Sequence, residues 1–164
     1  MRLVVGINSD IGRVVESNWI DQKIAHHAST RYRKHSREYR PHIDLTEEII
    51  LSDQIRYDSA VLCAGITRLA KCREDPIGTR RINVEGALNL AQYLSDQGSQ
   101  VIFLSTDKVY DGMSQYRSPE DEVSPVSEYG RQKAEAEKGI LGLPNGVVLR
   151  VAKVIYPDQL LMAD

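Results

Sequence analysis

Short apolar runs alternate along the chain with longer segments in which apolar residues recur every three or four positions. The apolar runs predict five strands, at residues 2–6, 29–33, 59–65, 100–106 and 146–155. The periodic segments predict four helices, over residues 11–25, 44–55, 75–97 and 125–141. Because strands alternate with helices, we expect an α/β protein: a Rossmann-like doubly wound parallel sheet with helices on both faces.

Length and composition narrow the class of protein. The chain has 164 residues, of which 41% are hydrophobic and 27% charged, and we interpret residues 1–164 as one domain. A net charge of −2 gives no general electrostatic reason to bind nucleic acid or an anionic membrane. No apolar run is long enough to span a bilayer or to act as a signal peptide, so we expect a cytoplasmic protein.

The cysteines and histidines do not suggest a metal site. Cys63 and Cys72 have neither metal-binding spacing nor the number needed for a disulfide framework, and we expect reduced thiols. Cys63 lies in an apolar run and is interpreted as a small core residue. His26 and His27 are interpreted as a solvated helix end. The sequence therefore predicts no bound metal.

Two connections follow predicted strands at the edge where open α/β sheets bind ligands. Residues 6–12, "GINSDIG", join the first strand to the first helix, with Gly6 and Gly12 at the corner. Glycines there allow a tight turn and bring backbone N–H groups close to a pyrophosphate, although an ordinary βα turn is the alternative. The long loop 111–125 follows the fourth strand and is a second candidate functional segment.

Basic residues follow the second predicted strand, in "TRYRKHSREYR" (30–40). Basic side chains at this place suit the 2′-phosphate of NADP, whereas an acidic residue suits the free ribose of NAD. Our candidates are Arg33 and Lys34, which slightly favour NADP over NAD. A solvated basic loop is the alternative; nucleic-acid binding is disfavoured because the chain is acidic overall.

Four stretches, in order along nearly the whole chain, are similar to one known family. They are "VLCAGITRLAKCREDP" (61–76), "INVEGALNLAQYL" (82–94), "VIFLSTDKVYDG" (101–112) and "SPVSEYGRQKAEAEK" (124–138). Together they resemble the extended short-chain dehydrogenase/reductase superfamily, and within it the dTDP-4-dehydrorhamnose reductase group. The resemblance implies an NAD(P)H-dependent reductase of a keto group on a nucleotide-activated sugar.

The resemblance also implies roles for individual residues. Thr106 would hydrogen-bond the substrate carbonyl, Tyr129 would donate a proton to it, and Lys133 would bind the nicotinamide ribose and lower the pKa of Tyr129. Asn83 would bond backbone near the active site. The cofactor-binding residues carried over are Gly6, Ser9, Ile11, Gly12, Asp44, Leu45, Cys63, Ala64, Gly65 and Lys133.

Three departures from the family pattern keep other functions open. Ser9 stands where the family has a third glycine, so its side chain either crowds the pyrophosphate or hydrogen-bonds it. Val151 and Lys153 replace a threonine and an aromatic residue, and little of the family's C-terminal substrate part follows. The alternatives are a non-catalytic NAD(P)-binding module, like the related regulatory subunit of methionine adenosyltransferase, or a fragment of an enzyme. Association with a second copy or a partner subunit is expected, through helices 75–97 and 125–141 or an exposed edge near residues 147–155.

Overall fold

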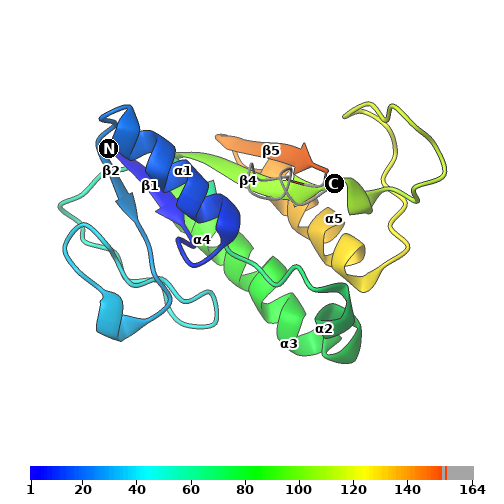
Figure 1. The fold of residues 1–164 in the computed structure, drawn as a ribbon, viewed down its shortest axis with the longest axis horizontal. Coiled ribbons are helices and arrows are strands. Elements are labelled where there is room, and N and C mark those ends of the chain that lie inside the picture. Colours follow the sequence, from blue (N-terminus) through cyan, green and yellow to red (C-terminus); the bar gives the residue numbers. More distant parts are fainter. Residues whose placement is uncertain (153, 155–164) are drawn as a thin grey trace, which may run out of the picture.

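Five parallel strands form a single sheet in the order β2-β1-β3-β4-β5 in the computed structural model, which describes residues 1–152 and 154 (Figure 1). The strands are β1 (Arg2–Val5), β2 (His26–Ala28), β3 (Ser59–Leu62), β4 (Gln100–Thr106) and β5 (Gly146–Val151). The helices are α1 (Asp10–Asp21), α2 (Leu69–Glu74), α3 (Pro76–Arg80), α4 (Ala87–Asp96) and α5 (Glu128–Leu141). The predicted Rossmann-like α/β fold is confirmed.

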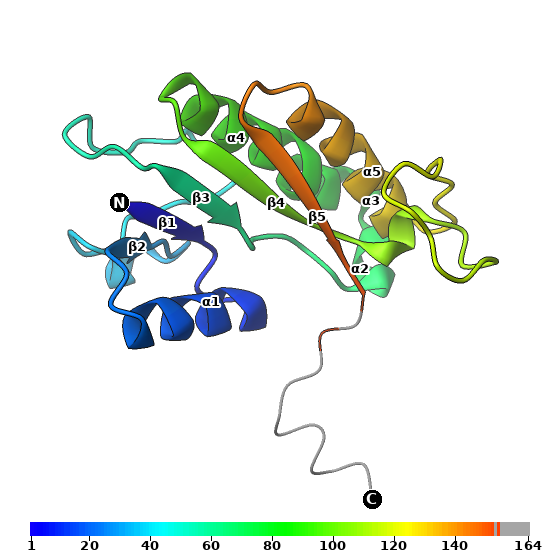
Figure 2. The ribbon, with the colours of Figure 1, turned by 90° about the horizontal axis from the view of Figure 1, so that it is seen from above.

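Helices cover both faces of the sheet, as Figure 2 shows, with α1 on one side and α4 and α5 on the other. The larger core joins inward side chains of the strands to α4 and α5, with Phe103, Leu90 and Ile140 almost completely buried. The smaller core packs Trp19 of α1 against Val4 and Val61. Burial on both faces explains why the strands read as continuous apolar runs.

The strand order reverses between β1 and β3, which run in register from Arg2↔Ser59 to Val5↔Leu62. The connection from β1 leads to β2 on one side, and the next strand, β3, lies on the other side. Open α/β sheets bind ligands in the crevice at such a reversal, outside the carboxyl ends of the strands. The fold therefore points to the residues that follow Val5 and Leu62.

The predicted second strand and the helix after it are wrong. The strand lies at His26–Ala28 rather than 29–33, and the described residues 44–55 contain no helix. Asp44 accepts a hydrogen bond from the Thr46 backbone N–H at 2.9 Å, a local turn that competes with helix formation. Apolar residues of this segment instead pack one by one against the core: Leu45, Ile49, Leu51 and Ile55.

The histidine pair is also not a solvated helix end. Helix α1 stops at Asp21, and Lys23 turns the chain with a φ of 55°. His26 and His27 therefore enter strand β2, where His27 is buried and its Nδ1 lies 2.9 Å from the Tyr57 hydroxyl.

The predicted helix over 75–97 is three consecutive pieces. Asp75 caps α3, a π-helical segment spans Arg81–Gly86, and α4 follows. Gly86 permits the close approach of the Leu45 carbonyl oxygen, because a Cβ there would lie 1.9 Å from it. Hydrophobic periodicity does not reveal such a π segment, since the apolar spacing changes over a single turn.

The remaining boundaries shift less. Strand β4 matches its prediction, while β1 and β3 end earlier than expected, and α5 begins at Glu128 after its cap, Ser127. Strand β5 ends at Val151; residues 153 and 155 of the predicted strand lie outside the described residues.

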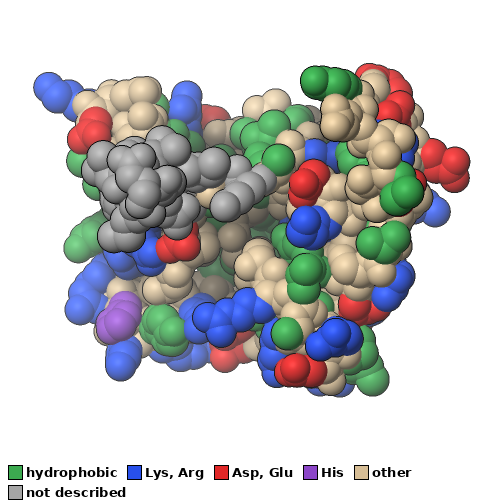
Figure 3. All heavy atoms as spheres, turned by 45° about the vertical axis from the view of Figure 1, so that its right-hand side comes forward, with side chains coloured by type: hydrophobic (Ala, Val, Ile, Leu, Met, Phe, Trp, Pro, Cys, Tyr) green, Lys and Arg blue, Asp and Glu red, His purple; other side chains and the backbone are tan. Residues whose placement is uncertain are grey.

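The outer surface carries mixed charge, with acidic and basic side chains interspersed over the face seen in Figure 3. Strand β5 forms one edge of the sheet, and Val147 and Leu149 are 40% and 50% exposed there. Within the described part of the chain, no helix has the length and apolar character required to cross a membrane.

Candidate functional site

The turn after β1 is built around Gly6, whose φ is +95°. A Cβ on Gly6 would lie 2.8 Å from the backbone nitrogen of Ala64, so glycine lets this turn meet the end of β3. Gly12 has a related role one turn into α1, where a Cβ would lie 2.3 Å from the Gly6 carbonyl oxygen. Both glycines are therefore required by close packing at the switch point.

Ser9 is part of this turn and forms the N-cap of α1. Its Oγ accepts a hydrogen bond from the Gly12 N–H at 3.0 Å and donates one to the Gly6 carbonyl at 2.8 Å. Its extended backbone, with a φ of −89°, does not require glycine. The hydroxyl thus closes the turn at the position where the resemblance led us to expect a third glycine.

A cavity of about 540 Å³ lies at the switch point. Eight of the predicted cofactor residues line it: Gly6, Ser9, Ile11, Asp44, Leu45, Cys63, Ala64 and Gly65. Gly12, Arg33 and Lys34 lie outside it. Asn8, Asp10 and Arg31 also line the cavity and were not among the sequence-based candidates.

The basic residue at the cavity is Arg31 rather than Arg33 or Lys34. Arg33 is exposed and forms an ion pair with Glu47. Arg31 could have been found as a basic residue just after the second strand. It was missed because the strand predicted over 29–33 includes residue 31. Because β2 ends at Ala28, Arg31 lies in the connection that borders the cavity.

A second cavity, of about 390 Å³, adjoins the first and contains the predicted catalytic residues Thr106, Tyr129 and Lys133. The two cavities have six lining residues in common: Asp10, Ile11, Cys63, Ala64, Gly65 and Thr67. The structure therefore brings together side chains from β4 and α5 beside the glycine turn.

Helix α5 is capped by Ser127, and Gly130 lets it lie close to the turn that follows β4. The Ser127 Oγ accepts a hydrogen bond from the Gly130 N–H at 3.1 Å, and a Cβ on Gly130 would lie 2.2 Å from the Lys108 carbonyl oxygen. One helical turn separates Tyr129 from Lys133, so the two side chains share a face. Sequence spacing was sufficient to predict that relationship.

The electrostatics differ from the expectation for this pair. Burial raises the pKa of Tyr129 to about 12, and Lys133 does not lower it. Burial also lowers the pKa of Lys133 to about 7, although nearby Glu137 and Cys63 oppose that shift. Lys133 donates a hydrogen bond to the Leu104 carbonyl at 2.6 Å and lies 3.6 Å from the Phe103 ring centroid. Desolvation therefore outweighs the charge attraction expected from spacing alone.

The Thr106 hydroxyl is engaged locally at the end of β4. It donates to the Asp107 carboxylate at 3.1 Å and accepts from the Lys108 N–H at 3.2 Å. The adjacent Ser105 hydroxyl is buried without a hydrogen-bond partner among the described residues, and Ser105 also lines the second cavity.

Asn83 bonds backbone near the site, as expected. Its side chain accepts from the Ile66 N–H at 2.7 Å and donates to the Ile66 carbonyl at 2.9 Å. Ile66 follows β3 and lines the first cavity. The π-helical segment thus anchors the loop that borders the glycine turn.

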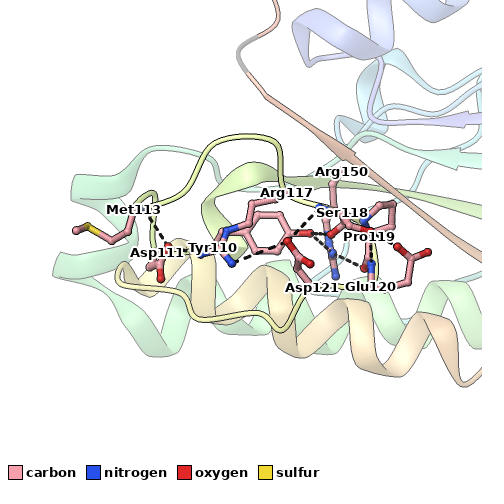
Figure 4. A network of polar contacts seen from close by, with 9 residues as sticks. All are labelled: Tyr110, Asp111, Met113, Arg117, Ser118, Pro119, Glu120, Asp121 and Arg150. Atoms are coloured by element: carbon pink, nitrogen blue, oxygen red, sulfur yellow. Dashed lines mark hydrogen bonds and ion pairs between the residues drawn. The ribbon is translucent and has the colours of Figure 1, made fainter.

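The loop 111–125 has an ordered base, drawn in Figure 4. The Tyr110 ring lies between the guanidinium groups of Arg117 and Arg150, at 5.4 and 5.1 Å from its centroid. Arg150 donates to the Pro119 carbonyl at 3.0 Å and pairs with buried Glu137 at 2.7 Å. No residue of the loop lines either cavity, so its predicted part in ligand binding stays a prediction.

The described residues fit a nicotinamide dinucleotide. The N-terminus of α1 and the glycine turn offer backbone donors for a pyrophosphate, and Arg31 offers a cation in the lining of the cavity. The second cavity leads from Gly65 to Tyr129 and Lys133. Within the described part of the chain, no cluster of three or more His, Cys, Asp or Glu residues could hold a metal ion.

The sheet order and the two cavities at its switch point define a Rossmann-like α/β domain. The chain matches the family model described as "RmlD substrate binding domain" over residues 1–159, and it belongs to that family.

Two curated relatives show the range of functions among similar proteins. A dTDP-4-dehydrorhamnose reductase of Sinorhizobium fredii is 34% identical over 120 residues, which are 70% of this chain and 40% of that protein. Methionine adenosyltransferase 2 subunit beta of Rattus norvegicus is 27% identical over 163 residues, 95% of this chain and 47% of that protein. The chain therefore spans about half the length of these relatives.

Solved structures share the fold. A hypothetical dTDP-4-dehydrorhamnose reductase from Sulfolobus tokodaii has a TM-score of 0.79 and 23% identity, covering 94% of this chain and 56% of that one. MoeE5 in complex with UDP-glucose and NAD has a TM-score of 0.74 and 22% identity, covering 92% and 52%. The reductase from Bacillus anthracis in complex with NADP has a TM-score of 0.73 and 20% identity, covering 92% and 52%.

Proposed function

We propose that the chain forms the cofactor-binding and catalytic half of an NAD(P)H-dependent reductase that acts on a keto group of a nucleotide-activated sugar. The observation that carries this proposal is the meeting of Thr106, Tyr129 and Lys133 in a cavity continuous with the one at the glycine turn. Membership of the family and the names of the reductase relatives support it.

In this proposal, bound reduced nicotinamide supplies the hydride. Tyr129 donates its phenolic proton to the carbonyl oxygen. Its raised pKa means that the phenol is still protonated at neutral pH and has this proton to give. Thr106 orients the same oxygen once its hydroxyl turns from Asp107, and Lys133 holds the nicotinamide ribose. Cys63 and Gly65 line both cavities, where the two adjoin.

The test begins with binding. NADPH and NADH are titrated separately while the fluorescence of Trp19, the single tryptophan, is followed for energy transfer to the nicotinamide. NADPH oxidation is then measured with dTDP-4-dehydrorhamnose. Tyr129→Phe is expected to keep cofactor affinity and to lose roughly 10²–10⁴-fold in turnover, the usual contribution of a general acid. Unchanged turnover in this variant would refute the assigned role.

Arg31 supports NADP as the preferred cofactor. Arg31→Ala is expected to weaken NADPH binding about tenfold and to leave NADH binding unchanged, because it removes one charged contact to the 2′-phosphate. Arg33→Ala is the matched control, since Arg33 is exposed and pairs with Glu47. Equal effects of the two substitutions on NADPH affinity would show that Arg31 does not bind the 2′-phosphate.

A second candidate is a non-catalytic nucleotide-binding subunit that associates with a second copy or a partner protein. The engagement of the Thr106 hydroxyl with Asp107 and Lys108 favours it, as does the match to methionine adenosyltransferase 2 subunit beta across 95% of the chain. Saturable cofactor binding without turnover, together with association measured by sedimentation, would support this candidate.

A further inference from the structure

Gln132 is a buried polar residue on the catalytic helix that the proposed chemistry does not use. Its side chain is 1% exposed and lies in α5 between Tyr129 and Lys133. Burying a glutamine costs side-chain entropy and desolvation, and an apolar residue of the same size would fill the space at less cost. The hydrogen bonds of its amide must therefore account for its place in the helix.

The nitrogen of the Gln132 amide faces acceptors on α3 and on its own helix. It donates to the Thr79 hydroxyl at 3.0 Å and to the Pro76 carbonyl at 3.2 Å, and the Glu128 carboxylate lies 3.2 Å away. Thr79 donates its own proton to the Asp75 carbonyl at 2.7 Å, so its oxygen is free to accept from Gln132. The direction of the amide is thereby determined.

The oxygen of the same amide accepts from Asn83 at 2.9 Å. The second proton of the Asn83 amide goes to the Ile66 carbonyl at 2.9 Å, and the Asn83 oxygen accepts from the Ile66 N–H at 2.7 Å. An unbroken line of hydrogen bonds thus joins the Ile66 backbone, in the first cavity, to Gln132 on the helix that lines the second.

This series of hydrogen bonds limits the rotation of α5 about its own axis. Gln132 precedes Lys133 by one residue and follows Tyr129 by three, so its side chain points about 100° away from that of Lys133. A helix free to rotate slightly would carry Tyr129 and Lys133 sideways across the second cavity. The amide bonds to the neighbouring elements oppose that movement.

We propose that Gln132 is a positioning residue, which through Asn83 couples the orientation of Tyr129 and Lys133 to the backbone of Ile66 in the first cavity. The part of this inference that concerns ligands rests on the proposed function. Gln132 does not touch the reacting atoms; it acts through the helix.

The principal test is amide hydrogen exchange in Gln132→Met, which keeps the length of the side chain and removes its hydrogen bonds. We expect the Ile66 amide to exchange about tenfold faster, the equivalent of one net hydrogen bond, while amides of β4 such as Phe103 stay within about twofold. Gly139→Ala is the control for general destabilisation, because its Cβ would lie 2.5 Å from Leu88 at the far end of α5. Faster exchange in both regions, or in neither, would overturn the proposal.

The second readout uses ligands. Gln132→Met is expected to bind NADPH about tenfold more weakly, equivalent to one lost contact of ordinary strength, and to bind 2′,5′-ADP as the unmodified chain does. Equal weakening for both ligands would overturn the positioning role. If the unmodified chain binds neither NADPH nor NADH, the proposed function fails, whereas the exchange comparison still decides the link.

A milder variant keeps the proposal testable if Gln132→Met does not fold. Thr79→Val removes one acceptor of the Gln132 amide and leaves the bond from Asn83 intact. A smaller increase in Ile66 exchange is expected, and no increase would contradict the coupling.

Discussion

Replacing Lys133 by methionine should stabilise the fold near neutral pH even though it removes a proposed catalytic residue. The Lys133 side chain is buried against Phe103, and its pKa falls from an ordinary 10.5 to about 7 because burial disfavours the ammonium. Methionine keeps much of the apolar stem and carries no charge. Glu137 retains hydrogen bonds from Arg150 to both of its carboxylate oxygens, so the substitution does not leave that carboxylate unpaired.

The size and sign of the effect follow from proton binding. Between pH 7 and pH 10.5 the unfolded chain holds a proton at Lys133 that the folded chain has released, so stability rises with pH in this window. A pKa difference of this size penalises folding by about 4 kcal/mol at pH 7 and about 2 kcal/mol at pH 9. The lost hydrogen bond to the Leu104 carbonyl offsets about 1 kcal/mol of the gain.

The assay is urea unfolding of the unmodified chain and of Lys133→Met at pH 7, 8 and 9. The variant should be more stable at pH 7, and its advantage should shrink by about 2 kcal/mol by pH 9. Other titrating groups, including Cys63, are present in both proteins and largely cancel in the difference. Lys138→Met, on the exposed side of the same helix, is the matched control for replacing a lysine of α5 by methionine. A difference between the proteins that stays constant across these pH values would refute the assignment of a depressed lysine pKa.

Two further substitutions test the frame of the site. Gly6→Ala should destabilise the chain by more than about 2 kcal/mol in urea unfolding, because it adds a clash with Ala64 to an unfavourable φ. Gly98→Ala is the control for backbone strain alone, because Gly98 has a φ of +83° and open space around it. Equal losses of stability in the two variants would exclude a contribution from the clash. Arg150→Met should lower the free energy of unfolding by about 3–5 kcal/mol, since it leaves Glu137 buried without its main partner. Limited proteolysis should then cut the loop 111–125 faster. A loop as resistant to the protease as before would show that Arg150 does not anchor it.

Much of the fold and part of the site could be predicted from local pattern. Strand β4 reads as a buried apolar run, and the spacing of Tyr129 and Lys133 places them on one helical face whatever surrounds them. The glycine turn was recognisable because Gly6 and Gly12 stand between a strand and a helix. These features depend on neighbours within a few positions along the chain.

Contacts between distant segments decided the rest. The apolar positions of 44–55 had helical spacing, but burial against the α4 core and the turn at Asp44 left them without a helix. Arg31 lines the cavity and Arg33 does not, because β2 pairs with β1 three residues earlier in the chain than the pattern suggested. The pKa values of Tyr129 and Lys133 and the bonds of Gln132 depend on which atoms surround them. Sequence by itself therefore determined the order of elements and the candidate catalytic side chains. Tertiary packing decided the charge and orientation of these side chains and the residues that hold them, because burial and hydrogen bonding join positions far apart in the chain.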